Sequence, residues 1–279
     1  MDDRTVDDDT EQASRAETDS FSPAPTPSAH GYPRARAECY HRRTVADRRL
    51  DVDFYAEAAI ETEGPVLEMA CGTGRIYLPL LDLGIEADGF DRSAAALGVL
   101  RDVAADVGLS PTVWQADMTA FAVDRTYDLV VCPFNGFQHL LTVEDQLAAL
   151  SNAYEVLSPG GRLRLDVFVP RFEYVCDTHG EWQTEAVAYR GASCELRTLT
   201  RVVDEVEQIL SVRNQLVDPE GELVFDERHR MKMLPKREVE LLARQSPFES
   251  WTVTRNFSEE PLTDGDTVQV WTFEKARRS

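Results

Sequence analysis

Long apolar runs are missing from this 279-residue chain, and its first residues are acidic rather than basic. No stretch approaches the roughly 18 consecutive apolar residues that a membrane-spanning helix needs. The acidic start does not read as a secretory signal, so we expect a cytoplasmic protein without a membrane partner. The 43% of hydrophobic residues is ample for one large globular domain, or for a domain with a sizeable insertion.

Lysine is scarce as well. Only Lys232, Lys236 and Lys275 stand among the 29 basic residues, against 50 acidic residues, and the formal net charge is −21. A protein surface that binds duplex nucleic acid replaces counterions with Lys and Arg, so this charge argues against a nucleic-acid partner. An acidic, lysine-poor composition is typical of halophilic archaea, where salt screens the self-repulsion. An acidic protein of a GC-rich mesophile is the alternative.

Cysteine patterns that hold metals or build disulfide frameworks are absent. The sequence has no C-x-x-C pair and no companion histidine cluster. The five cysteines are widely spaced: Cys39, Cys71, Cys132, Cys176 and Cys194. We therefore predict no metal site and no disulfide framework, and we expect buried, reduced thiols.

Residues 66–74 read Val-Leu-Glu-Met-Ala-Cys-Gly-Thr-Gly, an apolar strand that leads into a turn of small residues. Glycine tolerates positive φ and has no Cβ, so a nucleotide-like ligand could approach the backbone of this turn. A helix predicted over residues 75–83 would direct free backbone N–H groups at such a ligand.

From Pro65 onward strand and helix patterns alternate, which predicts an α/β fold with a parallel sheet and helices on both faces. The strands are expected over residues 66–69, 86–90, 112–115, 127–132 and 161–168. The helices are expected over residues 75–83, 93–107 and 143–157, with one more between Leu50 and about Thr62. The Ser-Pro-Gly-Gly sequence at 158–161 should end the helix before the fifth strand.

After Pro170 the pattern changes to period two, over residues 182–189, 194–203, 206–217 and 223–233. Turn residues at 218–221 (Asp-Pro-Glu-Gly) separate the last two segments, which predicts a small inserted antiparallel sheet. A helix over 237–245 and strands over 250–257 and 267–273 should then close the main sheet. The expected organisation is a disordered acidic tail (1–36), a first α/β part (37–171), an inserted β lid (172–234) and a closing part (235–279).

Three short motifs stand at the carboxyl ends of the first three predicted strands: Glu68-x-Ala70-x-Gly72-x-Gly74, Asp91, and Ala116-Asp117-Met118. Together they resemble class I S-adenosylmethionine-dependent methyltransferases, over roughly residues 40–273. The resemblance implies a Rossmann-like seven-stranded sheet, S-adenosylmethionine as cofactor and methyl transfer as the reaction. The inserted β segment is similar to the subgroup that methylates small molecules, including amino-sugar and glycine-type N-methyltransferases. The family usually has glycine where this chain has Ala70.

The resemblance assigns cofactor binding to ten residues: Tyr40, Glu68, Ala70, Cys71, Gly72, Gly74, Asp91, Asp117, Met118 and Cys132. It implies that Glu68 lies near the cofactor's ammonium, that Asp91 accepts from the ribose hydroxyls, and that Asp117 accepts from the adenine amino group. The turn would let the backbone approach the methionine part, and Cys132 would offer its carbonyl. Met118 would cover the adenine or only fill core. Tyr40 would close over the methionine end or only anchor a helix.

The loop after the fourth predicted strand, residues 132–140, is where a small methyl acceptor should bind, because ligands lie beyond the carboxyl ends of parallel strands. His139 is the most plausible general base there, since its ordinary pKa lies near neutrality; capping or packing is the alternative. Asn135 and Gln138 could orient a polar acceptor. The inserted strands also carry Arg197, Arg201, Arg213, Arg228, His229 and Arg230. These are either solvated or, if they face the pocket, suited to a carboxylate or phosphate.

Three other functions are alternatives to methyl transfer to a small molecule. A protein that binds S-adenosylmethionine as a sensor, without catalysis, is compatible with the same motifs. An aminopropyltransferase would need an acidic cluster after the fourth strand, where the sequence at 132–135 is Cys-Pro-Phe-Asn. An NAD-dependent dehydrogenase would need glycine at position 77, where Tyr77 stands. The Asn-Pro-Pro-Tyr signature of nucleic-acid N-methyltransferases is absent, and the oligomeric state stays open.

Overall fold

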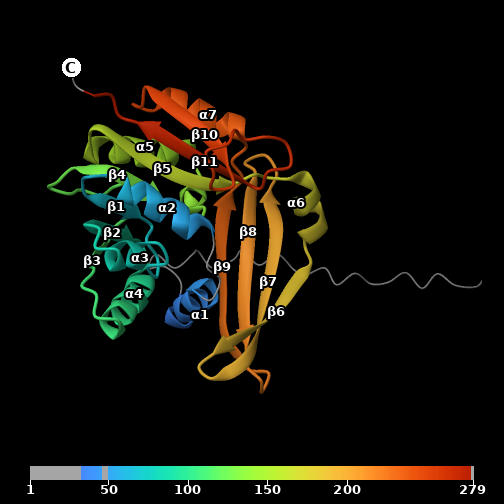
Figure 1. Cartoon of the computed structure of the whole chain (residues 1–279). Coiled ribbons are helices and arrows are strands. Elements are labelled where there is room, and N and C mark those ends of the chain that lie inside the picture. Colours follow the sequence, from blue (N-terminus) through green and yellow to red (C-terminus); the bar gives the residue numbers. More distant parts are fainter. Residues whose placement is uncertain (1–32, 46–49, 278–279) are drawn as a thin grey trace, which may run out of the picture.

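The computed structural model describes residues 33–45 and 50–277, in which helices cover both faces of one β-sheet and a second sheet projects from it (Figure 1). The first sheet has seven strands in the order β10-β11-β5-β4-β1-β2-β3. Strands β1 to β5 run parallel, and β11 is antiparallel to both β5 and β10. Its strands are β1 (Val66–Met69), β2 (Ala87–Asp91), β3 (Thr112–Gln115), β4 (Tyr127–Cys132), β5 (Leu157–Phe168), β10 (Ser250–Arg255) and β11 (Val268–Glu274). The predicted α/β, Rossmann-like class is confirmed.

Two apolar clusters fill the space between this sheet and its helices. On one face, strand residues pack with α2, α3 and α4, and on the other they pack with α5 and α7. The helices are α1 (Arg34–Val45), α2 (Leu50–Ile60), α3 (Tyr77–Asp82), α4 (Ala94–Asp106), α5 (Val143–Val156), α6 (Phe172–Thr178) and α7 (Lys236–Gln245), with a 3₁₀ turn η1 (Gly136–His139). Within the described ranges, no helix combines the length and apolar character needed to cross a membrane.

Helix α1 was not predicted, and it takes in residues 34–36, which the sequence placed in the acidic tail. Its sequence is rich in arginine and lacks an apolar periodicity. Tertiary packing holds it instead: Ala37 contacts α4 residues, and Cys39 is buried against the second sheet. The rest of the predicted tail, residues 1–32, lies outside the described part of the chain.

Two element boundaries also differ from the prediction. Helix α3 begins at Tyr77 rather than at residue 75, because the turn after β1 continues through Ile76. Strand β5 begins at Leu157, before the Ser-Pro-Gly-Gly segment rather than after it. The strand register jumps there by three residues against β4, and Gly160 has φ +85°. The proline and glycines therefore form a bulge inside the strand.

The second sheet is antiparallel, in the order β6 (Trp182–Tyr189), β7 (Ala192–Asp204), β8 (Ile209–Val217), β9 (Leu223–Lys232). These four strands match the predicted inserted segments closely. Figure 1 shows α1 beside the β9 edge, between this sheet and α4. A cross-strand row of Leu196, Leu216 and Phe225 packs with Cys39 of α1. We call the face that carries this row the inner face.

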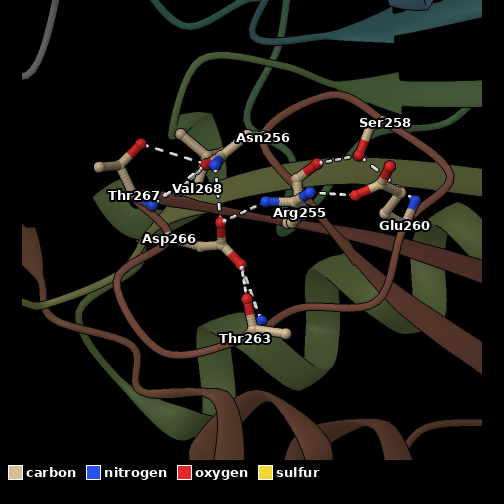
Figure 2. A network of polar contacts seen from close by, with 8 residues as sticks. All are labelled: Arg255, Asn256, Ser258, Glu260, Thr263, Asp266, Thr267 and Val268. Carbon is tan, nitrogen blue, oxygen red and sulfur yellow. Dashed lines mark hydrogen bonds and ion pairs between the residues drawn. The ribbon is translucent and has the colours of Figure 1, made fainter.

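The loop between β10 and β11, residues 256–267, is fixed by a polar network (Figure 2). The Asp266 carboxylate accepts from the Thr263 N–H at 2.7 Å and pairs with Arg255, which also pairs with Glu260. Asn256 Oδ1 accepts from the backbone N–H groups of Thr267 (3.1 Å) and Val268 (2.9 Å). These polar contacts hold the conformation of the loop.

Phe257 of this loop packs against α2. The centre of its ring lies 5.9 Å from that of Phe54 and 6.3 Å from that of Tyr55, both on α2. Tyr55 in turn donates from its hydroxyl to Asp166 of β5 at 2.7 Å. The β10–β11 loop therefore supports the position of α2 over the sheet.

Asn256→Ala tests this network. Asn256 has φ +46°, so alanine loses the side-chain bonds and also carries left-handed strain. We expect the free energy of unfolding to fall by about 1–3 kcal/mol, measured by urea denaturation. Asn256→Gly is the matched control, because it loses the same bonds without strain. It should lose less than Asn256→Ala, and equal losses would contradict the strain.

Candidate functional site

The turn after β1 has three residues with left-handed backbone: Ala70 (φ +58°), Gly72 (φ +55°) and Gly74 (φ +85°). A Cβ at Gly74 would lie 2.8 Å from Leu78 Cγ, so no side chain fits there. A Cβ at Gly72 would meet only the Asp91 carboxylate, at 4.0 Å. The space in front of Gly72 is thus an open cradle bordered by a carboxylate.

Glu68 lies beside this cradle with only 2% of its surface exposed. Its Oε2 has no hydrogen-bond partner among the described residues. Burial raises the pKa of the Glu68 carboxyl well above its ordinary value, although the positive charge of Arg75 opposes the shift. A buried carboxyl oxygen without a partner fits a ligand that brings a hydrogen-bond donor or a cation.

Asp91 ends β2 and is buried at the same edge of the sheet. Its two oxygens accept from the Gly72 N–H at 2.9 Å and from the Ser93 N–H at 2.7 Å. Burial raises the pKa of Asp91, and these two bonds lower it in part. An ionised carboxylate can accept about four hydrogen bonds, so it retains capacity for ligand hydroxyls.

Two of the remaining candidates lie on the segment after β3. Asp117 is exposed, and its Oδ1 accepts from the Thr119 N–H at 2.9 Å. The Met118 side chain is buried in the core cluster that contains Phe90. The exposed carboxylate is available to a ligand, whereas the methionine already packs in the core.

Asp166 of β5 shapes the loop that follows β4. Its oxygens accept from the Phe134 N–H at 2.8 Å, the Asn135 N–H at 3.1 Å and the Tyr55 hydroxyl at 2.7 Å. Phe134 and Asn135 both have left-handed backbone, with φ +54° and +60°. Burial raises the pKa of Asp166 to about 6, against the effect of these bonds. The carboxylate therefore clamps a strained loop directly after the buried Cys132 that ends β4.

A second buried contact links α2 to the glycine turn. Arg75 donates to both Asp51 oxygens, at 2.9 and 2.5 Å, and its guanidinium lies 4.4 Å from the centre of the Phe134 ring. The Tyr40 ring of α1 lies edge-on to Phe134, with ring centres 6.0 Å apart. Tyr40 thus brings α1 into contact with the loop after β4.

His139 is the last residue of η1 and is exposed to solvent, although protein groups surround it. Its ring centre lies 5.4 Å from that of His229 on β9. Desolvation by the surrounding protein groups and the neighbouring His229 lower the pKa of His139 to about 4. The imidazole is therefore neutral at pH 7, where it can accept a hydrogen bond but binds a proton weakly.

Gln138 fixes this arrangement of η1 and β9. Its amide donates to the Lys232 carbonyl at 2.8 Å and accepts from the Phe168 N–H at 3.1 Å. The side chain is fully buried. The predicted orienting residue Gln138 thus faces the protein interior, whereas the adjacent His139 is exposed beside His229.

The inserted sheet turns its arginines away from the inner face. Cross-strand register places on the opposite face Arg197, Arg201, Arg213, Arg228 and Arg230. The Arg197 guanidinium pairs with Glu195, and that of Arg213 with Asp226. Only His229 of the predicted basic residues shares the inner face, so the sheet offers the site no arginine fork for an anion.

Sequence reasoning missed four site residues. These are Asp51, Thr73, Arg75 and Asp166. Asp166 had a detectable signal, since it is an acidic residue inside an otherwise apolar run of β5. Asp51 and Arg75 pair across 24 positions, and no local pattern marks such a pair. No cluster of metal-ligating side chains occurs in the part of the chain that the structure describes.

Comparisons with known proteins agree with this geometry. Residues 66–161 match the family described as "Methyltransferase domain". A curated relative, "Putative methyltransferase YqeM" of Bacillus subtilis (strain 168), is 27% identical over 230 residues, which cover 81% of this chain and 88% of the relative.

Two solved structures share the fold. An S-adenosylmethionine-dependent methyltransferase from Clostridium acetobutylicum ATCC 824 superposes with a TM-score of 0.70 at 16% identity, covering 86% of this chain and 98% of the other. The sugar N-methyltransferase KedS8 from Streptoalloteichus sp ATCC 53650 superposes with a TM-score of 0.64 at 17% identity, covering 86% and 92%. Residues 66–161 therefore match a methyltransferase domain, and the described chain shares the fold of these two methyltransferases.

Asp166→Asn is expected to lower the free energy of unfolding by about 1–3 kcal/mol, because one amide oxygen replaces two acceptors that face three donors. The pKa of Asp166 is about 6 in the folded chain against an ordinary 3.8, so the folded state binds more protons between these values. The contribution of Asp166 to stability therefore falls as pH rises through that window.

Asparagine does not titrate, so the stability gap between wild type and Asp166→Asn should shrink from about pH 4 to about pH 6 and then stay constant. Urea denaturation across this range measures the gap. A gap that widens with pH would be inconsistent with a raised pKa.

Ala70→Gly should raise the free energy of unfolding by up to about 1 kcal/mol, because glycine adopts φ +58° without steric cost. Thermal denaturation is the measurement. Ala148→Gly in α5 is the control and should lose about 1 kcal/mol, because helical backbone favours alanine. A loss at Ala70 equal to that at Ala148 would show that no strain is stored in the turn.

Proposed function

We propose that this chain transfers a methyl group from S-adenosylmethionine to a nitrogen or oxygen of a small molecule. The observation that carries the proposal is the convergence, at one edge of the sheet, of the open cradle at Gly72 with the buried carboxyls of Glu68 and Asp91. The fold shared with a protein described as a sugar N-methyltransferase supports a small acceptor.

The residues at this edge fit the cofactor. We propose that the partnerless Glu68 oxygen lies near the cofactor's ammonium and that Asp91 accepts from its ribose hydroxyls. The backbone at Ala70, Cys71, Gly72 and Gly74 would lie along the methionine part, with the open space in front of Gly72. Bound there, the cofactor supplies an electrophilic methyl group on a sulfonium.

The other assigned residues complete the same proposal. The exposed Asp117 would accept from the adenine amino group, and Met118 would contribute only through the core cluster in which it packs. Cys132 would offer its backbone carbonyl, and Tyr40 of α1 would close over the methionine end from its place beside Phe134.

The acceptor would bind beside His139, where η1 meets the inner face. Methyl transfer needs an unprotonated nucleophile about 3–3.5 Å from the methyl carbon, in line with the breaking bond. His139 is neutral at pH 7 and so could accept a hydrogen bond from that nucleophile and orient it.

Cofactor binding is tested by thermal denaturation with S-adenosylmethionine or S-adenosylhomocysteine in high salt. At about 100 times Kd, a ligand stabilises the folded state by about 2.7 kcal/mol, which should raise Tm. Asp91→Ala and Gly72→Ala should abolish most of the shift. Gly108→Ala is the matched control for Gly72, because Gly108 also has positive φ and open space around it. An absent shift in the wild type would refute the proposal.

Catalysis is separated from mere cofactor sensing by a second experiment. The protein is incubated with methyl-labelled S-adenosylmethionine and a metabolite extract, and labelled products are resolved by mass spectrometry. A labelled small molecule is the expected result. A thermal shift without any labelled product would favour the sensor instead.

A further inference from the structure

The inner face of the second sheet becomes polar where it approaches the site. Next to the apolar row that packs on α1, cross-strand register places Thr198, Asn214 and Glu227. Asn214 is buried, and its Oδ1 accepts from the Thr198 hydroxyl at 3.0 Å. The following row contains His229. The inner face therefore changes from apolar to polar along the strands, towards the contact of β9 with η1.

Glu227 carries a negative charge in this row. Its carboxylate lies 3.7 Å from Arg36 Nε of α1 and 3.3 Å from His229 Nδ1. Burial alone would raise the pKa of Glu227, but the bond to His229 and the charge of Arg36 outweigh it and lower the pKa. The ionised carboxylate is therefore fixed beside His229.

This contact defines the tautomer of His229. A carboxylate only accepts hydrogen bonds, so the Nδ1 facing it carries the hydrogen, and the lone pair of the neutral ring is on Nε2. The His139 ring lies 5.4 Å away, centre to centre, on η1. The bond from Gln138 to the Lys232 carbonyl, three residues beyond His229, fixes η1 against β9 at this point.

We propose that His229, oriented by Glu227, removes the proton from a protonated amine that binds beside the two histidine rings. The inference rests on the proposed function and narrows it to N-methylation. In this assignment His229 is catalytic and Glu227 is a positioning residue. The net charge of −21 and the outward arginines favour the approach of a cationic acceptor over an anionic one.

The step balances without a further reactant. An N–H bond of the ammonium breaks, its proton passes to Nε2 of His229, and the freed lone pair attacks the methyl carbon. The bond from methyl to sulfur breaks with its electrons left on sulfur. The product is a methylated ammonium, and His229 returns its proton to water.

The charges around His229 suit this task. Glu227 stabilises the imidazolium, Arg36 of α1 opposes it, and Arg92, which follows β2, acts on the neighbouring His139. Desolvation and the neighbouring His229 lower the pKa of His139. Of the two rings, His229 is the one that contacts the Glu227 carboxylate.

An NMR titration of the histidine ring signals tests the pair without any acceptor. Glu227→Gln should lower the share of neutral His229 rings that carry their hydrogen on Nδ1, read from the ring nitrogen shifts, because the carboxylate that accepts this hydrogen is lost. His229→Gln should move the titration midpoint of His139 to higher pH. Arg230→Gln is the control, since Arg230 is adjacent in sequence but lies on the outer face, and it should change both readouts much less. An unchanged His229 tautomer in Glu227→Gln would overturn the proposal.

The second arm measures S-adenosylhomocysteine release with amino sugars and with the parent sugars that carry hydroxyl at the same carbon. The wild type should methylate the amine of a pair, and His229→Gln should lower the rate by roughly 100-fold or more. Glu227→Gln should lower the rate less than His229→Gln does, whereas Arg230→Gln should match the wild type.

The two proposals fail in different ways. Turnover of the hydroxyl partner alone, or an unchanged rate in His229→Gln, would overturn the amine assignment and leave methyl transfer intact. Absence of a thermal shift with the cofactor would instead refute the proposed function. If no sugar probe is methylated, the titration arm decides the inference.

Discussion

The buried Asp166 carboxylate holds together the segments that form the site. It accepts from Tyr55 of α2 and from two N–H groups of the loop after β4, and so joins a helix on one face of the sheet to the loop at its carboxyl edge. That loop leads into η1 and His139. The buried pair of Asp51 and Arg75 adds a second tie between α2 and the glycine turn. Both contacts bury charge, so each stabilises the fold only with its partners in place.

Much of the fold could be predicted from the sequence, because alternating strand and helix patterns, turn residues and period-two segments are local signals. The four strands of the second sheet and the glycine turn belong to this class. Helix α1 could not be predicted, because its arginine-rich sequence has no apolar stripe and tertiary contacts hold it. The bulge in β5 was missed for a related reason. Ser-Pro-Gly-Gly indicates a turn, and only pairing with β4 shows that the strand continues through it.

For the site, the sequence located the carboxyl-edge residues but could not show which face each side chain occupies. The end of β1 carries Glu68 and leads to Gly72, and the end of the neighbouring parallel strand β2 carries Asp91. Parallel topology alone therefore brings these residues to one edge of the sheet. The arginines of the inserted strands were ambiguous, because a shift in register by one residue exchanges the two faces of a sheet. The register places them outside and leaves a histidine and a carboxylate inside. The basic groups near these two residues come from elsewhere in the chain, from Arg36 of α1 and from Arg92 after β2.

Helix α1 contacts each part of the site. His41 lies 3.3 Å from the Thr73 hydroxyl in the glycine turn, Tyr40 packs on Phe134, and Arg36 lies beside Glu227 on the second sheet. Helix α1 thus borders both the region proposed for the cofactor and the region proposed for the acceptor. A displacement of α1 by one ligand alters the surface that the other ligand meets. Such coupling is reciprocal by thermodynamic linkage, so each ligand would change the affinity of the other by the same factor. Helix α1, which the sequence did not predict, would then couple the binding of the cofactor to the binding of the acceptor.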